Sequence, residues 1–153
     1  MNGKVAFLLG SETDRIIAEA SNKYFSYFGI SCEIMIMSAH RNPHSVAKFA
    51  SEARDNGYQI LIGGAGMAAH LAGALKAHST LPVIGVPMPG GIQDGMDALL
   101  ATVQMPKGVP VATMAVGKSG AINAAILCAE ILSINHEELI LKLNDFKANG
   151  SKL

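Results

Sequence analysis

Short apolar runs alternate with longer amphipathic stretches along this chain of 153 residues. The run from Val5 to Leu9 is uninterrupted, which is typical of a strand buried on both faces of a parallel sheet. Between such runs, apolar residues recur at the three- and four-residue spacing that predicts helices. The predicted strands are 5–9, 31–37, 60–62, 83–86 and 109–116, and the predicted helices are about 14–28, 43–55, 67–78, 95–103, 120–133 and 135–149.

This alternation of strand and helix predicts the fold class. It favours a single α/β domain over residues 1–153, in which a doubly wound parallel sheet lies between two layers of helices, of the flavodoxin-like or Rossmann-like kind. Asn42 followed by Pro43 predicts a helix start, and Asn135 with Glu138 resembles a capping box. We expect the last helix, at about 135–149, to pack in an oligomer.

Composition narrows the classes of function. The chain is 50% hydrophobic and only 16% charged, and its formal net charge is zero. This predicts a homo-oligomer, because excess apolar surface marks interfaces. Without a basic stripe or a run of about 20 apolar residues, we expect neither nucleic-acid binding nor a membrane span. Cys32 and Cys128 are interpreted as small buried hydrophobes in a reducing cytoplasm, and the N-terminus shows no signal-peptide pattern.

Three loops that follow the first three predicted strands carry candidate chemistry. The first contains Ser11, Thr13 and Asp14 at a strand-to-helix turn. Free N–H groups at such a turn attract anions, and the two hydroxyls can donate to phosphate oxygens. Asp14 would repel a phosphate but would accept hydrogen bonds from ribose hydroxyls, so the loop suits a ribose phosphate. The alternative is plain helix capping by these residues.

The second loop is Ser38-Ala39-His40-Arg41. It places a proton carrier beside a fixed cation at the carboxyl end of a strand, where open α/β sheets bind ligands. The alternative is a loop histidine without a role. His44, His78 and His136 fall on predicted helical or turn surfaces, and we interpret them as solvated. No pair of histidines has a helical metal-ligand spacing with a supporting acid, so no metal is expected.

The third loop, Gly64 to His70, matches G-x-G-x-x-A. A dinucleotide fingerprint would follow the first strand and would have an acid about 20 residues on, and neither condition holds. The small residues instead favour a loop whose backbone approaches a ligand closely. The alternative is that the glycines serve tight packing between strand and helix.

Together these loops resemble the N5-carboxyaminoimidazole ribonucleotide mutase family of purine biosynthesis. The resemblance spans nearly the whole chain, and its strength lies in the order and spacing of several motifs. These motifs are Gly10-Ser11-x-Thr13-Asp14, Ser38-Ala39-His40-Arg41-x-Pro43, Gly64-Ala65-Gly66-x-Ala68-Ala69-His70-Leu71, Gly85-Val86-Pro87, Val103-Gln104-Met105-Pro106 and Gly117-Lys118-x-Gly120-Ala121.

The resemblance implies an isomerase without cofactor or metal, which moves a carboxylate from the exocyclic nitrogen of an aminoimidazole ribonucleotide to ring carbon C4. It also implies an octamer. His40 would be the general acid and base, Arg41 and the first loop would hold the phosphate, and Asp14 the ribose diol. The expected substrate-binding residues are Ser11, Thr13, Asp14, Ser38, Ala39, Arg41, Gly64, Ala65, Gly66, His70 and Leu71.

Three other functions stay open at this point. The family's carboxylase branch uses free carbon dioxide, but it differs at the third loop and tends to have lysine at the position of Arg41. A non-catalytic nucleotide-binding module would keep Ser11, Asp14 and Arg41 without needing His40. A dehydrogenase is the most distant alternative.

The chain departs from the family pattern at several positions. Met67 stands at a glycine position of the family, and methionine would be strained there if the backbone needed a positive φ. Thr13 and Asn42 replace serine and threonine but keep their hydrogen-bonding capacity, and Ala72 replaces a proline. The stretch 89–94 differs more, and its glycines suggest a mobile lid.

Overall fold

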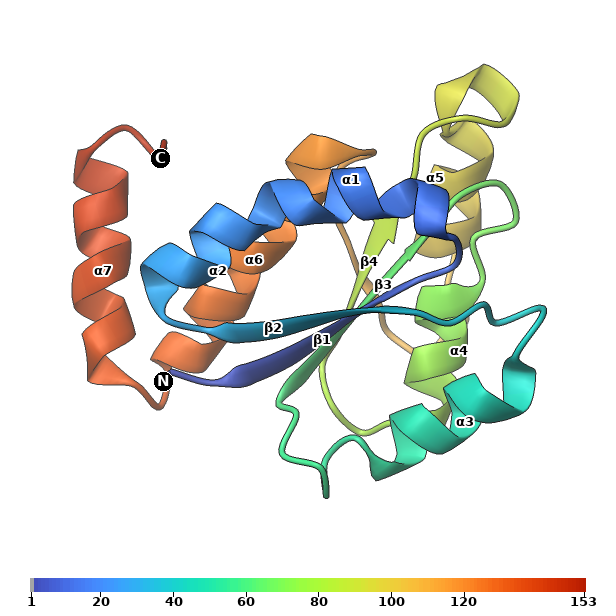
Figure 1. Ribbon diagram of the computed structural model, residues 1–153, viewed down its shortest axis with the longest axis horizontal. Helices are drawn as coiled ribbons and strands as arrows, with labels where there is room; N and C mark the ends of the chain where they lie inside the picture. The colour runs from blue at the N-terminus through green and yellow to red at the C-terminus, as the bar shows by residue number, and fades with distance from the viewer. Residues whose placement is uncertain (1) are drawn as a thin grey trace.

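Five parallel strands form one sheet in the computed structural model, which describes residues 2–153 (Figure 1). Their order, β2-β1-β3-β4-β5, is the flavodoxin-like order, and it reverses direction between β1 and β3. Ligands of such sheets bind outside the carboxyl ends of the strands at this reversal. The strands are β1 (Lys4–Leu9), β2 (Ser31–Ile36), β3 (Ile60–Ala65), β4 (Val83–Pro87) and β5 (Ala112–Thr113).

Helices cover both faces of the sheet and complete the predicted three layers. In Figure 1, α1, α2 and α6 lie on one side of the strands, and α3 and α4 lie on the other. The α/β, doubly wound prediction is therefore confirmed. The helices are α1 (Arg15–Ala18), α2 (Asn22–Phe28), α3 (Pro43–Glu52), α4 (Leu71–His78), α5 (Met96–Val103), α6 (Lys118–Ser133) and α7 (Glu137–Ala148), with single 3₁₀ turns at Glu12–Asp14, Glu19–Ser21 and Ile92–Asp94.

Two hydrophobic cores stabilise the layers, one on each face. Side chains of a strand alternate between faces, so Phe7 and Leu9 of β1 enter the core beneath α2 and α6, whereas Ala6 and Leu8 enter the core beneath α3 and α4. All four are fully buried. The interior strand β1 is therefore held by packing on both of its faces, and so is the start of the loop that follows it.

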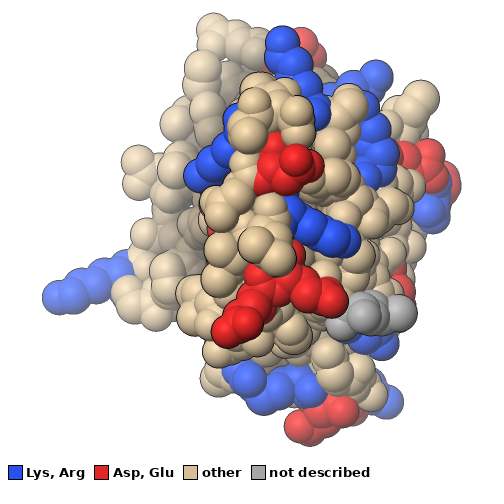
Figure 2. Space-filling model, turned by 90° about the vertical axis from the view of Figure 1, so that its left-hand side faces the viewer, with Lys and Arg blue, Asp and Glu red and all other residues tan. Residues whose placement is uncertain are grey.

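The C-terminal helix α7 packs on its own chain through one face. Leu139, Leu143 and Phe146 are buried against α2 and α6, and the Phe146 ring lies edge-on to Phe28 with centroids 5.7 Å apart. On the outside of this end, acidic and basic side chains are interspersed (Figure 2). Ile140 and Leu141 of α7 remain exposed. The expectation that this helix also packs in an oligomer stays a prediction.

Several predicted elements differ in extent from those in the structure. The strand expected over 60–62 continues to Ala65, so Gly64 and Ala65 of the predicted third loop belong to β3. The helix expected over 14–28 is divided by a 3₁₀ turn, where the buried Ser21 hydroxyl donates to the Ala18 carbonyl at 2.6 Å and tightens the chain. The strand expected over 109–116 shortens to Ala112–Thr113. Pro110 has no N–H to offer a sheet partner, which fits the late start of β5.

Two predicted helix starts are also wrong. The helix expected from residue 67 begins at Leu71, because Met67 adopts a left-handed φ of 50° that a right-handed helix cannot contain. The capping box at Asn135 does not form. The Asn135 N–H instead donates to Leu132 at the end of α6, and His136 is the N-cap of α7.

Candidate active site

A cavity of about 500 Å³ opens at the carboxyl edge of the sheet, where the loops after β1, β2, β3 and β4 meet. This is the crevice at the reversal of strand order, where the fold is expected to bind a ligand. Every predicted site residue except Gly64 lines it. The lining residues are Gly10, Ser11, Thr13, Asp14, Ser38, Ala39, His40, Arg41, Ala65, Gly66, Met67, Ala68, His70, Leu71, Pro89, Gly90 and Gly91.

The first loop holds its hydroxyls by capping and leaves its carboxylate without a capping bond. Ser11 Oγ accepts a hydrogen bond from the Thr13 N–H at 3.3 Å and lies 2.9 Å from Thr13 Oγ1. Ser11 therefore caps this turn as an acceptor, which leaves its hydroxyl hydrogen for Thr13 Oγ1 or for a ligand. Asp14 makes no capping hydrogen bond, and its partial burial raises the pKa of the carboxyl. A half-buried acid without a capping role is suited to accept hydrogen bonds from a ligand.

The second loop is a tight turn that presents two cationic or titratable side chains. The Ser38 hydroxyl accepts from the Arg41 N–H at 3.2 Å, and the Ser38 carbonyl accepts from the Asn42 N–H at 2.8 Å. Asn42 is indeed the N-cap position of α3, although its side chain makes no capping bond. The ion pairs of the described chain all involve residues other than Arg41. Its exposed guanidinium is therefore available to an anion.

The glycines at the end of β3 and at the start of the third loop have two different roles, tight packing and access for a ligand. A Cβ on Gly63 would lie 2.8 Å from the backbone of Ala72, and one on Gly64 would lie 2.5 Å from the Met88 side chain. These glycines serve tight packing, as the alternative interpretation held, and Gly64 is buried and does not line the cavity. Gly66 does line it, so close backbone approach to a ligand applies there.

His40 and His70 meet inside the cavity. His40 Nε2 lies 2.7 Å from His70 Nδ1, a hydrogen-bonding distance, and the rings are nearly perpendicular at 78°. One nitrogen of this pair carries the proton that the other accepts. The two residues come from adjacent loops of the predicted site, thirty residues apart in sequence. Together they form a proton-sharing unit beside Arg41.

The far rim of the cavity comes from the loop after β4, which the site prediction did not include. Gly90, Gly91, Gln93, Asp94 and Gly95 all adopt positive φ values. Two carboxylates hold this conformation: Asp94 accepts from the Gly90 N–H at 2.9 Å, and Asp97 accepts from the Ile92 N–H at 3.0 Å. The run of glycines was the available signal for this rim. Its role as a mobile lid stays a prediction.

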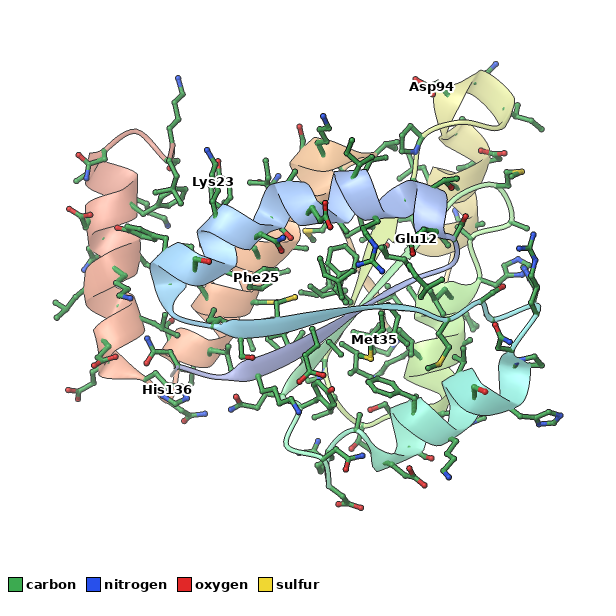
Figure 3. All side chains as sticks on the ribbon, in the orientation of Figure 1. Glu12, Lys23, Phe25, Met35, Asp94 and His136 are labelled. Atoms are coloured by element: carbon green, nitrogen blue, oxygen red, sulfur yellow. The ribbon has the colours of Figure 1, made fainter. Side chains whose placement is uncertain are left out.

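The remaining histidines lie outside the cavity. His44 and His78 are exposed, and His136, at the N-cap of α7, is partly exposed. It borders a smaller hollow of about 220 Å³, and Figure 3 shows it at the opposite end of the sheet from Glu12 of the first loop. Within residues 2–153, no three His, Cys, Asp or Glu side chains cluster as a metal site would require. No helix in this part of the chain is long and apolar enough to cross a membrane.

Comparison with known proteins identifies the family. A family model described as AIR carboxylase matches residues 4–152. The chain belongs to this family. An N5-carboxyaminoimidazole ribonucleotide mutase of Escherichia coli strain K12 is 42% identical over 144 residues, spanning 94% of this chain and 85% of that protein. A protein of the same name from Saccharolobus solfataricus is 46% identical over 143 residues, spanning 94% and 89%.

A solved structure supports the same assignment at the level of the fold. Treponema denticola PurE superposes with a TM-score of 0.86 at 26% sequence identity, covering 97% of this chain and 91% of that one. The fold of this chain thus occurs in a family whose relatives carry the name of an isomerase.

Proposed function

We propose that this protein is an N5-carboxyaminoimidazole ribonucleotide mutase, an isomerase of purine biosynthesis that forms 4-carboxy-5-aminoimidazole ribonucleotide. Family membership supports the reaction class. The observation that carries the proposal is the pair of His40 and His70 inside a cavity that Arg41 and Asp14 also line. It brings a proton carrier, an anion anchor and a diol acceptor within reach of one small ligand.

Substrate binding divides between two loops. Arg41 offers a fork of donors to the phosphate, and the Ser11 and Thr13 hydroxyls add further donors to its oxygens. Asp14 accepts hydrogen bonds from the ribose hydroxyls, which its lack of a capping partner favours. This arrangement leaves the ring of the ligand for the third loop, where His70 lies.

The chemistry needs one proton that leaves the enzyme and returns to it. His40 as imidazolium donates to the exocyclic nitrogen while the N–C bond breaks, so that the bond electrons stay on nitrogen and carbon dioxide is released. Ring carbon C4 then attacks the carbon dioxide and forms the new C–C bond. Neutral His40 removes the C4 proton, which restores the aromatic ring. General acid–base catalysis of this kind contributes about 10²- to 10⁴-fold.

His70 supports this cycle as a positioning residue. Its Nδ1 holds His40 Nε2, which fixes the orientation of the catalytic ring and provides a place for the proton between steps. The small side chains of Ala39, Ala65 and Gly66 let the cavity enclose carbon dioxide over the ring. Confinement contributes because positioned reactants combine far faster than free ones.

A product assay on the purified protein tests the proposal. One reaction contains the N-carboxylated substrate without bicarbonate, and the other contains the uncarboxylated ribonucleotide with bicarbonate. We expect the carboxylated product from the first reaction. Turnover of only the second would assign the protein to the carboxylase function, and turnover of neither, with binding retained, would leave a nucleotide-binding module.

We further propose that the protein acts in the cytoplasm as a homo-oligomer, an octamer in its full assembly. Exposed apolar side chains on two helices support an oligomer, because such surfaces are usually covered. Light scattering measures the number of subunits, and a monomer at micromolar concentration would contradict this part of the proposal. The exposed residues are Met96, Leu100 and Val103 on α5, and Ile140 and Leu141 on α7.

A further inference from the structure

Met67 combines two features that are unusual together. Its backbone is left-handed, with a φ of 50°, a conformation that residues with side chains adopt only at a cost. Its side chain is also 66% exposed, although methionine is apolar. Strained residues persist where the surrounding structure holds them, and they gather at ligand sites. Met67 lies at such a place, because it lines the cavity that contains His40 and His70.

The cavity has little other apolar surface of this size. Among its lining residues, only Met67 and Leu71 have apolar side chains larger than proline, and Leu71 is just 2% exposed because it packs into the core. Met67 is therefore the one large apolar side chain of the described lining that is free to contact a ligand. The exposed fraction of its surface is available to be covered on binding.

The backbone of Met67 also determines where the third loop turns. The Met67 carbonyl accepts from the Ala69 N–H at 2.9 Å, and the Ala68 carbonyl accepts from the His70 N–H at 2.9 Å. Met67 and His70, which are three residues apart in sequence, therefore lie on the same short turn. A ligand that is anchored by its phosphate at Arg41, and that offers its reacting atoms to His40, would place its ring in the cavity that Met67 also lines.

From these observations we infer that Met67 is a substrate-binding residue that packs its thioether on the planar ring of the ligand. The inference rests on the proposed function, since it takes the ligand to be a ribonucleotide with a flat heterocycle. Thioether sulfur is polarizable and makes favourable contacts with aromatic rings. The contact exists equally before and after the carboxylate moves, so it strengthens binding without changing the chemical step.

Two variants of Met67 separate the side chain from the backbone. Met67→Gly removes the side chain and relieves the left-handed strain, and Met67→Gln keeps a side chain of similar length with a polar end. We expect both to raise KM by about 3- to 10-fold, with kcat within about twofold of the wild type. Met67→Leu, which keeps an apolar side chain but lacks the sulfur, should raise KM by less than either of these variants.

Binding measurements identify the part of the ligand that is contacted. Calorimetry with 4-carboxy-5-aminoimidazole ribonucleotide should show the same loss of affinity in Met67→Gly and Met67→Gln, whereas ribose 5-phosphate, which has no ring, should bind both variants as it binds the wild type. Ser151→Gly is the matched control, because Ser151 is also left-handed, at 58°, but lies outside the cavity. It should leave KM unchanged.

The outcomes distinguish this inference from the proposed function. Wild-type turnover with unchanged KM and product affinity in both Met67→Gly and Met67→Gln would overturn the ring contact. An equal loss of ribose 5-phosphate affinity would overturn it as well. Absence of wild-type turnover would instead reject the proposed function.

Discussion

The two edges of the sheet differ in whether certain charged side chains find partners within the chain. At the amino edge, polar side chains satisfy one another: Lys4 pairs with Glu33 at 3.1 Å, the Tyr58 hydroxyl donates to Glu33, and Gln59 accepts from the Lys4 N–H at 3.2 Å. At the carboxyl edge, the Asp14 carboxylate makes no capping bond and the Arg41 guanidinium takes part in no ion pair of the described chain.

This difference separates residues that hold the fold from residues that await a ligand. A polar group whose partners lie within the chain contributes to stability, and its removal leaves another group unsatisfied. A polar group without such partners contributes little to holding the fold, and its removal is felt mainly when a ligand binds. Substitutions at the carboxyl edge should therefore change activity, and substitutions at the amino edge should change stability.

The largest expected effect is at His40. His40→Asn should lower kcat by about 10²- to 10⁴-fold, because the amide cannot transfer a proton. Calorimetry should still detect product binding, since the phosphate and ribose contacts remain. His44→Asn is the control, because His44 is exposed on α3 and lies outside the cavity. Full activity of His40→Asn would reject the proposed mechanism.

Two arginines, one near each edge of the sheet, test whether the edges differ in their effect on substrate binding. Arg41→Gln should raise KM by about 10- to 100-fold, because a hydrogen bond to a charged group is worth about 1.5–3 kcal/mol. Arg54, which borders the hollow near the amino edge, donates to the Thr80 hydroxyl at 3.1 Å. Arg54→Gln should leave KM unchanged in steady-state kinetics. Equal effects of the two substitutions would remove the distinction between the edges.

Asp14 should make substrate binding depend on pH. Because burial raises its pKa above the ordinary 3.8, KM should rise as the pH falls through that raised value and the carboxylate loses its charge. Asp14→Asn should bind more weakly at neutral pH and should lose this dependence. KM profiles of both proteins between pH 4 and 8 provide the measurement.

The same shift sets the sign of the effect of Asp14 on stability. The folded protein holds the proton of this carboxyl more tightly than the unfolded chain does, so the group costs stability as the pH rises through its ordinary pKa and then its raised pKa. Asp14→Asn should therefore be at least as stable as the wild type at pH 7 in urea unfolding. Clear destabilisation would show that Asp14 holds the fold.

The smallest expected effect lies at the amino edge. Tyr58→Phe removes the hydroxyl that donates to Glu33 and should lower the free energy of unfolding by about 1 kcal/mol. Its kcat and KM should match those of the wild type, because Tyr58 lies outside the cavity. Denaturant unfolding and steady-state kinetics on the same preparation measure both quantities. An altered kcat in Tyr58→Phe would show that a substitution at the amino edge affects catalysis at the carboxyl edge.

The sequence was sufficient to place the site because of a general property of parallel sheets. The carboxyl ends of all strands meet at one edge, so Ser11, His40 and His70 were expected together once their strands were recognised. The apolar runs were clear for β1, β3 and β4, which are buried on both faces. Local pattern and tertiary arrangement agree in these elements.

The features that were missed depend on contacts between distant segments. Gly64 resembles part of a ligand loop in sequence, but its surroundings are decided by Met88, which directly follows β4. Asp94 and Asp97 accept hydrogen bonds that hold the loop after β4, and nothing in their sequence pattern indicates this role. The left-handed backbone of Met67 was conceivable from the family pattern, but only the three-dimensional structure decides it.

The strand order makes the strand that leads to His40 less stable than the strand that leads to the first loop. β2, which leads to His40, is an edge strand that pairs only with β1, whereas β1 has a partner on either side. Local opening concentrates where hydrogen bonds are fewest. We therefore expect β2 amides to exchange with solvent sooner than those of β1. On warming, such a molecule would lose His40 and Arg41 together, while Asp14 of the loop after β1 was still in place.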